Sequence, residues 1–160
     1  LALEPGRYRS WELLTLASAQ EGADEFVEVA EERVTAWPHP RSSVLLVKSY
    51  ERHGDNLRAA WTALNAAGTY PNDWLVNLTL AAMLLKDAEA ESFLWRVDEA
   101  LKKAEKGLGA NPKRQSKIDF VLIKSIFLGL SNQPDEARKL LEGINPLTPE
   151  LQEVLRALGN

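Results

Sequence analysis

The sequence contains no cysteine and only two histidines. Without cysteine, disulfides, thiolate zinc sites and thiol nucleophiles are all excluded. A metal site would need more ligands at coordinated spacing than His39 and His53 provide. The chain also lacks a phosphate-binding glycine loop and a nucleophile elbow. We therefore expect a protein that is not an enzyme and that holds no cofactor and no metal.

Long apolar runs and an excess of positive charge are missing as well. The longest apolar stretch covers residues 78–85, whereas a membrane-spanning helix needs about eighteen apolar residues or more. The formal net charge is −4 and the isoelectric point is near 5.3, whereas a dedicated nucleic-acid binder carries a basic surface. We expect neither membrane insertion nor a nucleic-acid partner.

The start of the sequence has no basic signal region and no initiator Met at Leu1. Its first residues, LALEPG, look like the end of a helix. We therefore expect a fragment of a longer chain from which N-terminal targeting information is missing. The compartment stays undetermined, with the cytoplasm as the default expectation.

What the chain does have is a length of 160 residues, of which 45% are apolar and 26% charged. That composition is typical of a globular domain with a substantial core. Residues 44–71 predict two amphipathic helices joined by a tight turn at Gly54-Asp55. Small residues recur along the second helix at Ala59, Ala63 and Ala66. Pro71 follows the helix and closes the unit.

Prolines punctuate the whole chain at comparable intervals. The intervals are 33, 33, 41 and 37 residues, between Pro5, Pro38, Pro71, Pro112 and Pro149. An alanine precedes three of these prolines by twelve residues, at Ala59, Ala100 and Ala137. A unit of about 34 residues with two longer copies accounts for this spacing.

This order of large, small and breaker residues resembles the tetratricopeptide repeat (TPR) family. In that family the alanine lets the second helix of a repeat approach the first. The resemblance implies an all-α right-handed superhelical solenoid of about four helix pairs plus a terminal capping helix, as a single domain over residues 1–160. The repeats would cover residues 8–39, 40–73, 74–114 with an insertion, and 115–149, and the cap residues 150–158.

The pattern also predicts the individual helices. They cover residues 10–20, 23–37, 74–86, 117–131, 135–142 and 150–158. In the insertion, a further helix is expected to begin at Asp87, run to about Lys106 and end at Gly107 and Gly109.

In TPR arrays the first helix of each repeat lines a concave groove. Carried over by register, the resemblance implies ten partner-contacting positions: Lys48, Glu51, Arg52, Leu75, Leu78, Ala82, Leu85, Ile123, Ile126 and Phe127. The helices over 74–86 and 117–131 are apolar nearly all round, which means that both sides are covered. The cover could be a peptide, a second subunit or the chain's own terminal helix.

The resemblance implies a scaffold or adaptor that binds a protein or peptide ligand in this groove, as an extended segment or as a helix. Two alternatives stay open. The apolar face could close a homodimer, or the chain could be a docking or regulatory domain of a larger bacterial multidomain protein.

Two further features have competing interpretations. Seven cations between residues 102 and 124 could form a solvated rim, which is favoured, or contact an acidic partner or phosphate: Lys102, Lys103, Lys106, Lys113, Arg114, Lys117 and Lys124. Of the five tryptophans, most are expected in the core, with Trp74 and Trp95 as candidate exposed anchors.

Overall fold

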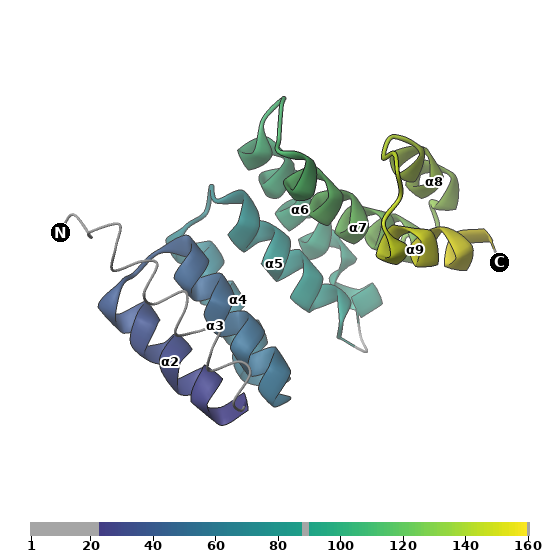
Figure 1. The fold of residues 1–160 in the computed structure, drawn as a ribbon. Coiled ribbons are helices and arrows are strands. Elements are labelled where there is room, and N and C mark those ends of the chain that lie inside the picture. The colour runs from purple at the N-terminus through teal and green to yellow at the C-terminus, as the bar shows by residue number, and fades with distance from the viewer. Residues whose placement is uncertain (1–22, 88–89, 160) are drawn as a thin grey trace. The chain divides into compact units, whose positions relative to one another are not determined.

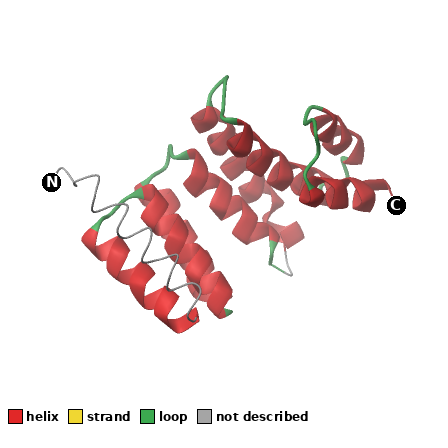
Figure 2. Cartoon of the chain, viewed as in Figure 1, coloured by secondary structure: helices red, strands yellow, loops and turns green. Residues whose placement is uncertain are grey.

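The structure, a computed structural model, describes residues 23–87 and 90–159 (Figure 1). Within these ranges every regular element is a helix and no strand occurs (Figure 2), so the all-α class is confirmed for the described chain. The helix expected over residues 10–20 lies outside the described residues. The chain divides into two compact units, Leu1–Pro71 (unit 1) and Asn72–Asn160 (unit 2), and each is described by itself.

Unit 1 contains three described helices, α2 (Ala23–Ala36), α3 (Pro40–His53) and α4 (Asn56–Thr69). The middle helix, α3, packs against both of the others. Local signals set its ends: the Nδ1 of His39 accepts a hydrogen bond from the N–H of Arg41 at 3.2 Å. Gly54 ends α3 at a φ of 85°, a left-handed conformation that glycine adopts without strain.

Small residues make the contact between α3 and α4 close. Ala59, Ala63 and Ala66 are all buried on one side of α4. The corresponding alanines of the later hairpins, Ala100 and Ala137, are buried too. The expectation that these alanines sit in the packed interior is therefore confirmed.

Unit 2 contains five α-helices and one 3₁₀ turn in its described residues. They are α5 (Trp74–Leu85), η1 (Ala90–Phe93), α6 (Leu94–Leu108), α7 (Arg114–Leu130), α8 (Pro134–Glu142) and α9 (Pro149–Gly159). Neighbours in sequence pack as the pairs α5–α6 and α7–α8. In addition α5 contacts α7, and α7 contacts α9, so the first helices of successive hairpins are neighbours.

The insertion differs from the expectation. Its helix begins at Leu94, after the 3₁₀ turn, and not at Asp87. The reason is that Asp87 still closes the preceding helix: its N–H donates to the carbonyl of Leu84 at 3.3 Å. Apolar periodicity continues through such a turn and cannot locate it. Farther on, Val97, Leu101 and Ala104 are buried as the periodicity predicts.

The end of α6 also differs, because the helix runs through Gly107 to Leu108. Only Gly109, with a φ of 74°, lies beyond the helix end. A Cβ at Gly107 would lie 2.9 Å from the carbonyl oxygen of Asn72 and 3.0 Å from the Cβ of Trp74. Gly107 therefore permits close packing of α6 on the start of α5, and Gly109 is the stop.

Gly107→Ala is expected to destabilise unit 2 by about 1–3 kcal/mol, because overpacking against backbone outweighs the better helix propensity of alanine. Gly68 in α4 offers the control, since a Cβ there would meet nothing within 4 Å. Gly68→Ala should be neutral or stabilise by up to about 1 kcal/mol. Chemical denaturation followed by circular dichroism measures both changes. Equal effects of the two substitutions would contradict the close-packing explanation.

The last three helices share one core. The helix α7 begins at Arg114, three residues before the expected start at Lys117, and α9 packs on both α7 and α8. The buried side chains of this core are Ile118, Val121, Leu141, Ile144 and Leu151. The chain's own terminal helix thus covers part of α7, which is one of the three covers considered for this apolar helix.

Candidate partner-binding surfaces

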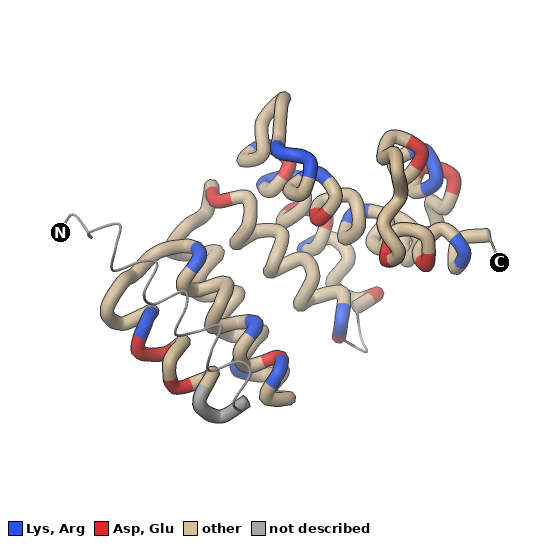
Figure 3. Tube along the Cα trace, viewed as in Figure 1, with Lys and Arg blue, Asp and Glu red and all other residues tan. Residues whose placement is uncertain are grey.

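The basic stretch of unit 2 contains paired and unpaired cations. Figure 3 shows the Lys and Arg positions along the trace. Lys102 and Lys103 pair with acids one turn back on α6, with Nζ–carboxylate distances of 2.7 Å to Asp98 and 3.3 Å to Glu99. Lys124 of α7 reaches Glu105 of α6 at 3.7 Å. The interpretation as a solvated, balanced rim fits these three lysines.

The groove positions of unit 1 all lie on α3. Lys48 and Arg52 are exposed, and Glu51 is half-buried. The guanidinium of Arg52 lies 5.7 Å from the centroid of the Phe26 ring on α2, an arrangement that orients a cation over an aromatic face. These side chains form a charged surface on α3.

The groove positions of unit 2 lie on α5 and α7, which contact each other. Two of them, Leu78 and Phe127, are only 4% and 9% exposed, so their side chains belong to the interior and offer almost no surface. The other five are half-buried: Leu75, Ala82, Leu85, Ile123 and Ile126. The structure therefore brings together a smaller accessible set than the register implied.

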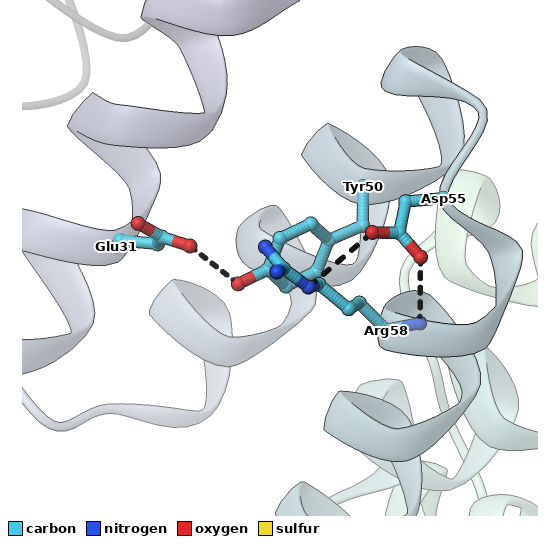
Figure 4. Close-up of polar contacts among 4 residues, drawn as sticks. All are labelled: Glu31, Tyr50, Asp55 and Arg58. Atoms are coloured by element: carbon cyan, nitrogen blue, oxygen red, sulfur yellow. Dashed lines mark hydrogen bonds and ion pairs between the residues drawn. The ribbon is translucent and has the colours of Figure 1, made fainter.

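A polar network joins the three described helices of unit 1 (Figure 4). The Tyr50 hydroxyl on α3 donates to Oε1 of Glu31 on α2 at 2.6 Å. Asp55, which precedes α4, accepts from the N–H of Arg58 at 3.1 Å and pairs with its guanidinium at 3.3 Å. That guanidinium also lies 5.9 Å from the centroid of the Tyr50 ring. The network holds α2 and α4 to α3.

Burial of Tyr50, then its hydrogen bond to Glu31 and the negative charge of that carboxylate, raise the pKa of the tyrosine hydroxyl to about 12. Desolvation and a neighbouring anion both disfavour the phenolate. The hydroxyl is therefore neutral throughout the physiological range. It acts as a hydrogen-bond donor that positions helices, and not as a base or a nucleophile.

Tyr50→Phe is expected to change the stability of unit 1 in a pH-dependent way. Because the folded-state pKa lies above the ordinary value of 10.0, the stabilisation is fully present below pH 10 and lost as the pH rises to 12. The wild type should lose roughly 2–3 kcal/mol over this range relative to the variant. Parallel denaturant titrations at several pH values measure the difference. Parallel pH profiles for the two proteins would refute it.

Large apolar side chains stand exposed outside the predicted groove. On α4 of unit 1, Leu57 and Trp61 are 82% and 66% exposed. On unit 2, Trp95 is 63% exposed, which agrees with its interpretation as a candidate anchor, and Phe93 is also exposed. The α4 pair was not among the expected contacts. The sequence did contain a signal for their exposure, because both residues lie opposite the alanines of α4 on the helical wheel.

The described residues were also compared with the requirements of a metal site and of a membrane-spanning helix. Across residues 23–87 and 90–159, no three His, Asp or Glu side chains gather to hold a metal ion. None of the helices described is long and apolar enough to cross a membrane. His39 caps α3 through its Nδ1, and His53 lies in the last turn of α3, where a cation is favourable. Both histidines thus have structural explanations.

The described residues offer several accessible surfaces: charged positions on α3, half-buried apolar positions on α5 and α7, exposed aromatic residues on α4 and α6, and exposed cations of unit 2. Comparison with protein-family models, with curated proteins and with solved structures gave no match.

Proposed function

We propose that this chain is a non-catalytic protein-interaction module built from TPR-like helical hairpins stacked as a right-handed solenoid. Three observations support the architecture: the α3–α4, α5–α6 and α7–α8 pairs, the buried alanines in their second helices, and the contacts of α7 with both α5 and α9. Proteins of this architecture present extended binding surfaces.

The observation that carries the proposed function is the exposed pair Leu57 and Trp61. The two residues are one turn apart on α4 and so lie on one face of the helix. Exposed aromatic side chains are enriched among the residues that dominate protein interfaces. A large apolar pair left in water has no folding role, so we assign it to partner binding.

The groove remains part of the proposal in a reduced form. Lys48, Glu51 and Arg52 would contact polar groups of a ligand. The half-buried side chains of α5 and α7 would receive an apolar segment or one face of a helix. Leu78 and Phe127 would support that surface from beneath.

The experiment that tests the proposal is affinity capture from a native lysate with the full chain, followed by binding measurements with the purified partner. Leu57→Ser/Trp61→Ser tests the α4 face, and Lys48→Glu/Arg52→Glu tests the groove. Lys139→Ser/Glu142→Ser, two exposed positions on α8, is the control. We expect a discrete partner whose binding is lost with the α4 variant and kept with the control. The proposal would be refuted if the partner bound both test variants as tightly as wild type, or if no discrete partner were captured.

Homodimerisation is the second candidate, and the composition of α4 favours it. This helix carries Arg58 as its single charged residue, so two copies could pack α4 against α4 with little charge to desolvate. Such an isologous contact would pair Trp61 with its own copy. Analytical ultracentrifugation over a range of concentrations distinguishes the cases: a dimer that Trp61→Ser dissociates supports this candidate, and a monomer at all concentrations excludes it.

A further inference from the structure

Four of the seven cations between residues 102 and 124 remain after the ion pairs of α6 and α7 are assigned. This basic cluster consists of Lys106, Lys113, Arg114 and Lys117. All four are exposed, and none forms an ion pair with a described residue. The sequence from Lys106 to Ile118 contains no acidic residue. The next acid on α7, Asp119, already accepts a hydrogen bond from Gln115 at 2.8 Å.

The fold places the cluster at one end of the α6–α7 pair. The two helices pack together and are joined by the short connection 109–113, so the last turn of α6 and the first turn of α7 lie at the same end (Figures 1 and 3). Lys113 and Lys117 are one helical turn apart, as are Arg114 and Lys117. Their charges therefore add over one small surface.

Arg114 is held in place by the adjacent loop. Its Nη2 donates to the carbonyl oxygen of Pro146 at 3.3 Å. This loop, residues 143–148, carries no charged side chain. The guanidinium is thus positioned without being neutralised.

Three cations of the cluster work against the stability of α7, because they lie at its start: Lys113, Arg114 and Lys117. The N-terminus of α7 carries the positive end of the helix dipole, where cations are unfavourable. Its first turn contains no acidic residue, and no side chain caps it. Because helix stability gives no reason for cations here, a recognition role accounts for them better.

We propose that the basic cluster docks a short acidic segment, rich in Asp and Glu, of a partner protein. This inference rests on the proposed interaction function and assigns a charge character to one part of the ligand. A short segment fits better than a nucleic acid, because unit 2 as a whole has twelve Lys and Arg against thirteen Asp and Glu.

A fluorescently labelled Asp/Glu peptide, titrated with the full chain and followed by anisotropy, tests the proposal. The test variant is Lys113→Glu/Lys117→Glu. The matched control is Lys102→Glu/Lys103→Glu, which makes the same change in net charge at two lysines that are already ion-paired. We expect salt-sensitive binding that the test variant weakens by about tenfold or more and the control weakens by much less.

Folding is checked in the same samples by thermal melting. The test variant should melt at the same or a higher temperature than wild type, because acids at a helix N-terminus are favourable. Lys113→Gln/Lys117→Gln, which removes the charges without reversing them, should also weaken binding. Loss of binding in a variant that keeps its melting temperature is then a loss of the surface and not of the fold.

Four results would overturn the inference. No peptide binding at low ionic strength would remove it, as would equal loss in test and control variants, which indicates net charge alone. Tighter binding of single-stranded DNA, or full competition by inorganic phosphate, would assign the cluster to a different anion. None of these results touches the proposed function, because that is decided by the α4 variants with the captured partner.

Discussion

Leu78→Glu is expected to destabilise unit 2 by about 3–5 kcal/mol, a large fraction of the roughly 5–15 kcal/mol by which an ordinary domain is stable. The side chain of Leu78 is 4% exposed on α5. The substitution removes its buried apolar surface and leaves a carboxylate with no charged partner in the interior. Urea denaturation followed by circular dichroism measures the loss. The repeat register implied that this position faces a ligand, and the fold would tolerate the change only if the groove were open to solvent.

Ala82→Glu is the matched control for this experiment. It introduces the same side chain one turn farther along α5, at a position that is half-buried. The longer stem of glutamate can carry its carboxylate into solvent there, so we expect a cost of about 1 kcal/mol or less. If Leu78→Glu left the protein as stable as Ala82→Glu does, Leu78 would be a surface residue after all and the groove would be open along α5.

Leu151→Ala is expected to destabilise unit 2 by about 2–5 kcal/mol, through lost burial and the cavity left behind. Leu151 is fully buried, and it is the buried residue that α9 contributes to the core formed with α7 and α8. Loosening of α9 should be visible first. Amide hydrogen exchange should rise across α9 and the facing part of α7, including the region of Gly129, where an added Cβ would lie 3.1 Å from Leu158.

Gln152→Ala provides the comparison, since Gln152 is the exposed neighbour of Leu151 on the same helix. Its substitution should change stability by less than about 0.5 kcal/mol. A small effect of Leu151→Ala with unchanged exchange in α7 would mean that α9 contributes little to the fold. The terminal helix would then be an accessory, and α7 would need another cover.

The sequence by itself determined the helical class and most helix limits. Turn and cap signals such as Gly54, Asp55 and Pro134 act on neighbouring backbone groups, so they can be interpreted without the rest of the fold. The buried alanines were predictable for a related reason. Alanine along one face of a helix lets another helix pack closely there, and α3 packs on α4.

In a uniformly apolar helix, the sequence could not predict which residues are buried. The twelve residues of α5 contain no charged side chain, so periodicity could not tell which positions face the interior. Leu78 became buried and Leu75 only half-buried because of what packs around α5. The same limit applied to the insertion. Asp87 closes α5 but has the composition of a helix start, so the sequence could not show where the next helix begins.

Tertiary contacts decided which side chains are exposed and which charges are paired. Pairing of Lys124 with Glu105 joins two helices across nineteen positions of sequence. Only the fold shows that Lys124 is paired and that the cations of the basic cluster form no ion pair with a described residue. The amphipathic pattern could indicate which side of α4 carries Leu57 and Trp61, but not whether that side is covered. Exposure is a property of the neighbours that pack on a residue, and these neighbours are chosen only when the chain folds.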